Sequence, residues 1–267
     1  MKRQMVERQK KPVATPMQAA IKPANKSIGK PVVISPAEMR QRLEEGVATL
    51  GLMLTPQQID ALLAYLGLIS QWNQVYNLTA VRDPADMLTH HLLDSLAVVA
   101  PLRTRLAALA YDMDGADSFA GASAPPGPPF RLLDVGSGAG LPGIVIAICC
   151  PEIRVDCVDT VAKKAAFINQ VAVGLKLPYL RGLHARVEKL TDLYDVVSSR
   201  AFASLADFVK GSNKLLAAHG VWLAMKGKHP GDELLVLPPV IDVFHVEQLT
   251  VPGLDAERCI VWMRKAA

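Results

Sequence analysis

A glycine-rich turn is the segment of this sequence best suited to binding a small molecule. An apolar run at 131–135 leads into Gly136, Gly138 and Gly140, and Pro142 then suits the first turn of a helix. Glycine lets the backbone adopt positive φ and approach a ligand, and the N–H groups of a helix start face the same space. We expect that Gly138, which lies between two other glycines, leaves no room for a Cβ. The turn predicts a site for a nucleoside-bearing cofactor.

Two acids indicate which cofactor that is. Asp134 ends the first strand, and Asp159 ends the next predicted strand, 23 positions after Gly136. A carboxylate at about this distance binds ribose hydroxyls in nucleotide sites. A pyrophosphate-binding loop rarely carries an acid at the position of Asp134. The pattern Asp-x-Gly-x-Gly-x-Gly resembles motif I of class I S-adenosylmethionine methyltransferases, in which the acid and the glycine amides meet the amino-acid end of the cofactor. The alternative is a turn that needs glycine only for packing.

Alternating apolar patterns predict the elements that position these residues. Such alternation is typical of an α/β fold with a doubly wound sheet, which binds ligands at the carboxyl ends of its strands. The last two strands have no helix between them, which predicts an antiparallel hairpin at the sheet edge, an ending that class I methyltransferases resemble. We expect strands at 131–135, 154–159, 178–183, 194–199, 220–226, 240–249 and 258–264, and helices at 142–150, 161–174 and 204–218.

Helix-start signals dominate the region before the sheet. Ser35 to Glu38 and Thr55 to Gln58 both match a capping box with proline at the first helical position, and Asp83 precedes a further helix. We therefore divide the chain into a basic disordered tail (1–34), an N-terminal helical cap (35–111), a linker (112–129) and a Rossmann-like domain (130–267).

The charge distribution singles out the start of the chain. The whole chain carries +4, whereas its first 31 residues carry +7. This segment is rich in proline and has no aromatic residue, which favours disorder, and its charge suits contact with RNA. A solubilising tail is the alternative.

Composition also excludes several classes of protein. There is no apolar run of membrane-spanning length and no secretory leader, so we expect a cytoplasmic protein without membrane contact. The four cysteines and six histidines lack metal-binding spacing, so we expect reduced thiols and no metal. We also expect a monomer.

The order of several motifs makes the resemblance more specific. Roughly residues 40 to 265 are similar to the bacterial small-subunit rRNA guanine-N7 methyltransferases, also called glucose-inhibited division protein B. That family's activity implies methyl transfer from S-adenosylmethionine to N7 of one guanine in a 16S rRNA loop near the decoding centre, with 16S rRNA or the small ribosomal subunit as partner. The motifs are Asn77–Asp83, His90–Ser95, Asp134–Gly143, Ser199–Ala203, Met225–Gly227 and Glu257–Arg258.

The resemblance also implies roles for individual residues. Gly136 and Leu141 would line the methionine and ribose side of the cofactor, Asp159 would bind the ribose, and Val187 and Glu188 the adenine. Arg200 and Lys226 would position the target base. The full implied cofactor set is Asp134, Gly136, Ser137, Gly138, Gly140, Leu141, Asp159, Thr160, Val187, Glu188 and Arg200.

The residues after the fourth strand bear on the chemistry. Ser198 to Phe202 contain neither the Pro-Pro-aromatic motif of amine methylators nor the nucleophilic cysteine of carbon methylators. Guanine N7 has an available lone pair, so positioning beside the methyl donor is sufficient. Phe202 is either a stacking surface for a base or part of the core. A nucleotide-dependent oxidoreductase and an RNA-binding protein without turnover are the alternative functions.

Overall fold

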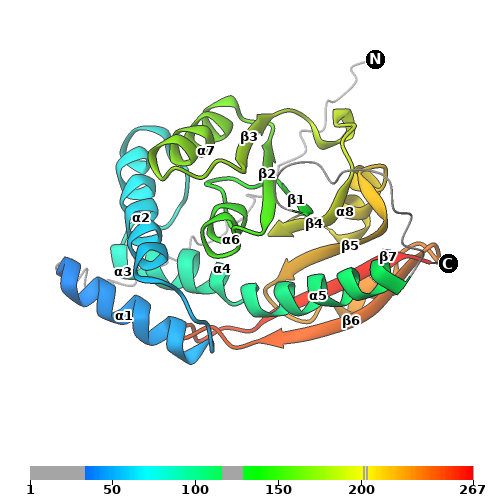
Figure 1. Cartoon of the computed structure of the whole chain (residues 1–267), viewed down its shortest axis with the longest axis horizontal. Coiled ribbons are helices and arrows are strands. Elements are labelled where there is room, and N and C mark those ends of the chain that lie inside the picture. Colours follow the sequence, from blue (N-terminus) through cyan, green and yellow to red (C-terminus); the bar gives the residue numbers. More distant parts are fainter. Residues whose placement is uncertain (1–33, 116–128, 201, 203, 267) are drawn as a thin grey trace, which may run out of the picture. The chain divides into compact units, whose positions relative to one another are not determined.

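The computed structural model describes residues 34–115, 129–200, 202 and 204–266. Its centre is a sheet in the order β3-β2-β1-β4-β5-β7-β6 (Figure 1). Neighbouring strands from β3 to β5 are parallel, and β7 is antiparallel to both β5 and β6. The strands are β1 (Phe130–Val135), β2 (Ile153–Asp159), β3 (Leu180–His184), β4 (Tyr194–Arg200), β5 (Leu216–Lys226), β6 (Ile241–Leu249) and β7 (Arg258–Lys265). This is the doubly wound sheet with an antiparallel C-terminal hairpin that the alternating pattern predicts, and it resembles the architecture of class I methyltransferases.

The order in which strands are added to the sheet reverses its direction between β1 and β4. It moves outward from β1 to β2 and β3, and then returns to place β4 on the other side of β1. At such a switch point the connections leave in opposite directions and open a crevice beyond the carboxyl ends of the strands. The glycine turn at 136–140 follows β1 at this crevice, and Arg200 ends β4 beside it.

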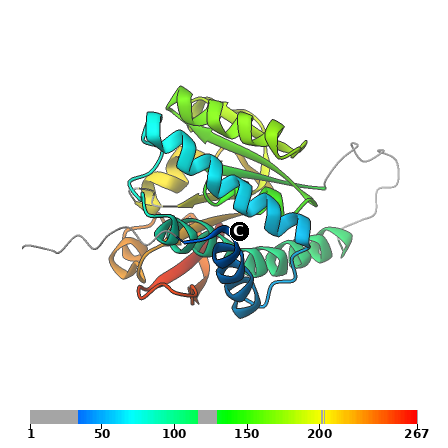
Figure 2. The same ribbon diagram turned by 90° about the vertical axis from the view of Figure 1, so that its left-hand side faces the viewer.

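Side chains alternate between two hydrophobic layers. Leu132 packs with one layer and Leu133 with the other, because successive side chains of a strand point to opposite faces. The first layer contains α6, α7 and the N-terminal helices, whereas α8 covers the second (Figures 1 and 2). The helices are α1 (Pro36–Thr49), α2 (Pro56–Tyr76), α3 (Pro84–Met87), the π-helix η1 (Leu88–Leu93), α4 (Asp94–Leu96), α5 (Val99–Gly115), α6 (Gly143–Cys149), α7 (Ala162–Gly174), the 3₁₀ turn η2 (Val187–Lys189), α8 (Leu205–Ser212) and α9 (Gly231–Leu235).

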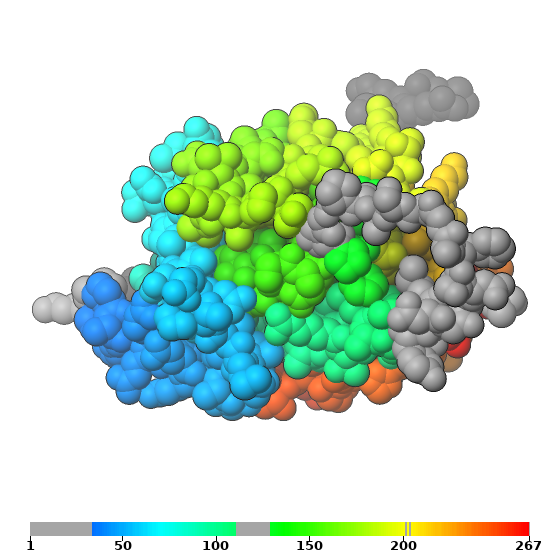
Figure 3. Space-filling view, in the orientation of Figure 1, coloured from blue at the N-terminus to red at the C-terminus, as the bar shows by residue number. Residues whose placement is uncertain are grey.

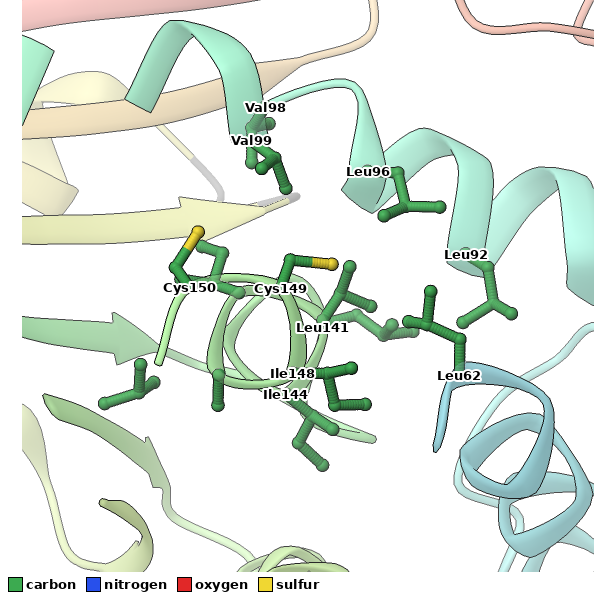
Figure 4. Packing of buried hydrophobic residues seen from close by; sticks show 14 of the residues in the cluster. Leu62, Leu92, Leu96, Val98, Val99, Leu141, Ile144, Ile148, Cys149 and Cys150 are labelled. Atoms are coloured by element: carbon green, nitrogen blue, oxygen red, sulfur yellow. The ribbon is translucent and has the colours of Figure 1, made fainter. Parts of the chain in front are cut away.

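Helix α6, which follows the glycine turn, is enclosed by the N-terminal helices. Every residue from Gly143 to Cys149 is buried, because the helix is apolar around its whole circumference. In Figure 4 its side chains meet Leu62 of α2 and residues from the segment between η1 and α5. The N-terminal helices and the sheet therefore share one core. The labelled residues are Leu62, Leu92, Leu96, Val98, Val99, Leu141, Ile144, Ile148, Cys149 and Cys150.

The predicted helix starts are present, with one partial exception. Thr55 and Gln58 form a complete capping box, and the carboxylate of Asp83 accepts hydrogen bonds from two backbone amides. Ser35 accepts a hydrogen bond from the amide of Glu38, but the return bond of a capping box is not formed there. The cap at α1 therefore supplies only one of the two bonds that its sequence predicts.

Several element boundaries differ from the sequence-based expectation. The helix expected at 204–218 ends at Ser212, because Leu216 pairs with Tyr194 and starts β5. Strand pairing thus overrides a local pattern that also fits a helix. Helix α5 continues to Gly115, four residues into the expected linker. The rest of that linker, 116–128, and the expected basic tail up to residue 33 lie outside the described residues.

Further elements were not expected from the sequence, and one of them is the 3₁₀ turn η2 between β3 and β4. Helix α9 lies between β5 and β6, and the segment around His90 and His91 forms a π-helix rather than an ordinary helical turn. On the face shown in Figure 3, α1, α2, α5 and α7 form the surface, with β6 along one edge. In the ranges that the structure describes, no helix is both long and apolar enough to span a membrane.

Candidate functional site: a glycine cradle between two cavities

Positive φ angles define the backbone of the glycine turn. The φ angles are +67° at Gly136, +60° at Gly138 and +89° at Gly140, a region that L side chains rarely adopt. A Cβ on Gly138 would have no neighbour nearer than the carbonyl oxygen of Gly136 at 4.0 Å. Our expectation that this position has no room for a Cβ is therefore wrong. Backbone conformation requires the glycine, and the added atom would enter empty space where a ligand can lie.

Steric exclusion operates instead at two other glycines. A Cβ on Gly140 would lie 2.3 Å from Cδ1 of Ile144, and one on Gly143 would lie 2.4 Å from Sγ of Cys157. Both neighbours are fully buried and cannot move aside cheaply. Gly140 and Gly143 thus pack the turn against the core, and neither lines the cavities described below.

Asp134 lies behind the turn and holds it. Its carboxylate accepts hydrogen bonds from the amide of Gly143 and the hydroxyl of Ser198, each at 3.1 Å. The side chain is completely buried and lines neither cavity. Burial raises the pKa of Asp134 to about 7, although Gly143, Ser198 and the charge of Arg200 oppose the shift. With this geometry, Asp134 can hold the turn in place from the buried side.

Asp159 lies beside the turn at the end of β2. One of its oxygens accepts a hydrogen bond from the amide of Gly138 at 3.1 Å, and the other accepts one from the amide of Val161 at 2.8 Å. The ammonium group of Lys164 is 3.5 Å from the carboxylate. The acid and the glycine turn, 21 residues apart along the chain, are therefore in direct contact.

A cavity of about 410 Å³ opens around Asp159. The structure brings together here most of the residues predicted for the nucleoside end of the cofactor. Val187 is half-buried, whereas Thr160 and Glu188 are exposed. Phe202 also lies on this wall, where its ring is 5.6 Å from that of Phe208. The lining includes Gly136, Asp159, Thr160, Val187, Glu188 and Phe202.

A second cavity, of about 660 Å³, adjoins the first at Gly136, which lines both. Its walls contain the other exposed part of the turn together with both predicted base-positioning residues. A Cβ on Gly136 or Gly138 would project into these cavities, since neither position has protein atoms close by. The bare backbone cradle therefore fits a nucleoside with an amino-acid arm. The lining includes Gly136, Ser137, Gly138, Leu141, Arg200 and Lys226.

Arg200 and Lys226 reach the second cavity, but each already has a partner. Nη1 of Arg200 donates to a carboxylate oxygen of Asp94 and to the carbonyl oxygen of His90, both at 2.9 Å. Nζ of Lys226 donates to both carboxylate oxygens of Glu233, at 2.8 and 2.9 Å. The two cations are thus fixed by side chains and backbone from other elements before any ligand enters.

Sequence reasoning missed three residues around this cavity. Asp94 bridges Arg200 and Arg258, with Nε of Arg258 donating to it at 2.8 Å. Tyr65 of α2 donates its hydroxyl hydrogen to the carbonyl oxygen of Ala139 at 2.7 Å. The motifs His90–Ser95 and Glu257–Arg258 contain the first two, but only the fold brings these distant segments together. Tyr65 belongs to an apolar helical stripe and carries no local signal.

His91 and the four cysteines are unsuited to proton abstraction or nucleophilic attack. Nε2 of His91 lies 2.9 Å from the hydroxyl of Thr79, and burial lowers the pKa of His91 to about 4. All four cysteines are buried free thiols that line neither cavity, and burial raises the pKa of each, for Cys150 to about 12. Neutral imidazole and protonated thiols are therefore expected at physiological pH.

Comparisons with known proteins place the chain among methyltransferases. The chain is 62% identical over 224 residues to a ribosomal RNA small subunit methyltransferase G from Polaromonas sp. strain JS666, covering 84% of this chain and 92% of the relative. It is also 62% identical to the protein of that name from Albidiferax ferrireducens, covering 86% and 99%. Among solved structures, the match to TrmN from Thermus thermophilus covers 54% of this chain and 46% of the TrmN chain, with 21% sequence identity and a TM-score of 0.44.

The family model described as rRNA small subunit methyltransferase G matches residues 58–110 and 116–261. These ranges contain the glycine turn, both adjoining cavities and the Asp94 bridge. With relatives above 60% identity over more than four-fifths of its length, the chain belongs to the rRNA small subunit methyltransferase G family.

Proposed function

We propose that the protein transfers a methyl group from S-adenosylmethionine to N7 of a guanine in 16S rRNA. The observation that carries the proposal is the pair of cavities that meet at Gly136. One suits the nucleoside of the cofactor, and the other opens toward basic side chains suited to RNA. Substrate of this kind implies that the protein works in the cytoplasm, where ribosomes assemble.

The residues around the first cavity would bind the cofactor. Asp159 would accept hydrogen bonds from the ribose hydroxyls, and Val187 would offer an apolar surface to the adenine, because both line this cavity. Gly136 and Gly138 would let the cofactor approach the protein backbone closely, because they carry no side chain. When bound, S-adenosylmethionine supplies an activated methyl group on a positively charged sulfur.

The residues around the second cavity would position the guanine. Arg200 and Lys226 present N–H donors from the ends of β4 and β5, and donors of this kind bind the acceptor edge of guanine or a phosphate. For methyl transfer they would have to contact O6 or a phosphate and leave N7 open. The lone pair of N7 would form the new bond to the methyl group while the methyl–sulfur bond breaks and its electron pair returns to sulfur, so no proton has to be removed. Holding the base in line with the methyl group is then the main contribution of these side chains.

Modification mapping tests the proposed reaction. Small-subunit rRNA from cells with and without the protein should differ at one N7-methylated guanine, and purified protein with S-adenosylmethionine should restore that mark. Methylation at a base atom other than guanine N7 would contradict the proposed reaction. Binding of NAD in place of S-adenosylmethionine would favour the oxidoreductase alternative, and cofactor binding without turnover on any RNA would favour a noncatalytic RNA-binding protein.

The pH profile tests the proposed mechanism. Single-turnover transfer at saturating cofactor should vary little between about pH 6.5 and 9, because neither His91 nor a thiol changes its protonation in that range. Asp134 does titrate near its lower end, so the Asp134→Asn variant should be measured in parallel and should give the same flat profile. A steep limb in both proteins, or a covalent enzyme–RNA adduct, would contradict the mechanism.

The basic tail and the oligomeric state complete the proposal. The excess charge of +7 in residues 1–31 supports a role as an RNA-binding arm. The active form is proposed to be a monomer, since both cavities are formed within one chain.

A further inference from the structure

Arg258 reaches the second cavity from the start of β7. Its Nε donates to Asp94 at 2.8 Å, and its Nη1 donates to the backbone carbonyl of Glu257 at 2.8 Å. The side chain retains 22% of its exposure and lines the same cavity as Gly136. A guanidinium group has five N–H donors, of which these two bonds use two. Arg258 is therefore held in place with donors to spare.

The charges around Asp94 do not balance. One carboxylate, only 5% exposed, lies between the guanidinium groups of Arg200 and Arg258. The trio carries a net charge of +1 in a partly desolvated place, and an uncompensated cation there is costly unless an anion joins it. Lys226 does not share this excess, because Glu233 pairs with it through both oxygens. The cavity wall thus offers one unbalanced positive charge to a ligand.

Strand order separates Arg258 from the expected cofactor position. The glycine turn follows β1, and β7 lies three strands away across β4 and β5. Adjacent strands are about 4.8 Å apart, so the backbone of Arg258 is offset by about 14 Å from the turn. Asp159 lies on the opposite side of β1, at the end of β2. An anion at Arg258 therefore lies on the side of the cavity away from the nucleoside pocket, the side that the proposed function leaves to RNA.

We propose that Arg258 binds a phosphate group of the rRNA strand beside the target guanine, and that Asp94 is the residue that positions it. This rests on the proposed function, because it takes rRNA as the substrate. Planar guanidinium groups bind phosphate oxygens through two parallel hydrogen bonds, which suits a fixed arginine with unused donors. The bridge also links Arg258 to Arg200, so that one carboxylate sets the orientation of both side chains.

Substituting Arg258→Gln provides the direct test. The variant should raise KM for the rRNA about tenfold or more, since hydrogen bonds to charged groups are of that strength. It should also reduce the salt slope of RNA binding by about 0.7, the value for one phosphate contact on a single strand. Affinity for S-adenosylmethionine without RNA should be unchanged in calorimetry. Arg258→Lys, which keeps the charge, should recover most of the salt slope.

Glu257→Gln serves as the matched control. It shifts the net charge by the same +1 as Asp94→Asn and leaves untouched the backbone carbonyl that Arg258 uses. Added positive charge by itself should strengthen RNA binding in both variants. Positioning predicts the opposite for Asp94→Asn: a higher KM for rRNA, with little further increase when Arg258→Gln is added, because coupled residues are not additive.

The outcomes separate the inference from the function on which it rests. If the wild-type protein places no methyl group on guanine N7, the proposed function fails. If it does, but Arg258→Gln keeps the wild-type KM and salt slope, only the inference is overturned. A loss of S-adenosylmethionine affinity in Arg258→Gln would instead assign the anion to the carboxylate of the cofactor and would also overturn it. Should Asp94→Asn fail to fold, the two Arg258 variants still decide the question.

Discussion

At the residue scale, the glycine turn combines two different requirements. Gly138 has a positive φ angle, and a Cβ added there would lie in open space. Gly140 also has a positive φ angle, but a Cβ added there would collide with the buried side chain of Ile144. Sequence cannot distinguish the two, because both appear as glycine in one repeating motif. Only the structure shows which glycine faces a cavity and which faces the core.

Alanine at each position should separate these roles. Gly138→Ala should weaken S-adenosylmethionine binding with a modest stability loss of about 1–2 kcal/mol, the cost of a left-handed L residue. Gly140→Ala should cost more in stability, because its methyl group would meet Ile144 at 2.3 Å. Calorimetry with the cofactor and thermal unfolding without it measure the two effects. Wild-type cofactor affinity in Gly138→Ala would contradict the assignment of the turn as the binding site.

Asp134 should make stability depend on pH. Burial raises its pKa from the ordinary 3.8 to about 7, so between these values the folded state holds the proton more tightly than the unfolded state. This group therefore lowers stability as pH rises from about 4 to 7, with a limiting slope of about 1.4 kcal/mol per pH unit.

Asp134→Asn removes that dependence and can still hydrogen-bond to Gly143 and Ser198. The difference in unfolding free energy between variant and wild type should grow in favour of the variant from about pH 5 to about pH 8. Denaturant unfolding at both values measures it. A difference that stays constant with pH would show that Asp134 does not titrate in this range.

At the element scale, helix α2 connects the N-terminal helices to the turn. Tyr65 donates to the carbonyl oxygen of Ala139 inside the turn, and Gln58 donates to two carbonyl oxygens at the end of α6. The N-terminal helices thus fix both ends of the segment that forms the cradle.

Tyr65→Phe should therefore affect both stability and cofactor affinity. It leaves the ring packed against Phe167 and removes only the bond to Ala139, at a cost of about 1–3 kcal/mol for a buried carbonyl left without its donor. Tyr194→Phe is the matched control, because that buried hydroxyl bonds to Asp156, which lines neither cavity. It should destabilise the protein without changing S-adenosylmethionine affinity. Equal affinities for the two variants would remove α2 from the support of the turn.

At the scale of the whole molecule, the charge distribution distinguishes the start of the chain from the rest. Residues 1–31 carry +7 while the remainder carries −3. Long-range attraction to RNA should therefore depend strongly on this segment.

Deletion of residues 1–31 should weaken RNA binding and reduce its salt slope by about 0.7 for each phosphate that the shortened protein no longer binds. The full-length chain with the eight lysines and arginines of this segment changed to glutamine should behave in the same way. Filter binding across a salt series measures both. If the deletion weakens binding and the glutamine variant does not, a specific interaction rather than charge is responsible. Identical slopes for all three proteins would make the segment irrelevant to RNA binding.

Local sequence patterns were sufficient to predict the class of fold and to select residues that line the candidate site, among them Gly136, Asp159 and Arg200. Continuous apolar runs, helical patterns, helix caps and the Asp134 to Gly143 motif depend on neighbouring residues, so they can be interpreted without tertiary information. They predicted the order of strands and helices from β1 to β7, apart from η2 and α9, and they assigned Gly138 and Asp159 to one cofactor site, two residues that the fold brings into contact. The end of the helix at Ser212 was missed because a strand partner, Tyr194, decides where β5 begins.

Tertiary packing, in contrast, determines what supports the site and which residues face each other across it. Asp94 meets Arg258 across 164 positions of sequence, and Tyr65 meets Ala139 across 74. Asp134 resembles a ligand-binding acid in sequence, yet complete burial turns it toward Gly143. Such contacts depend on how the sheet and the N-terminal helices pack, and packing joins residues that no local pattern relates. The motif therefore marks the candidate site, and the fold supplies the charges and hydrogen bonds that hold its residues in position.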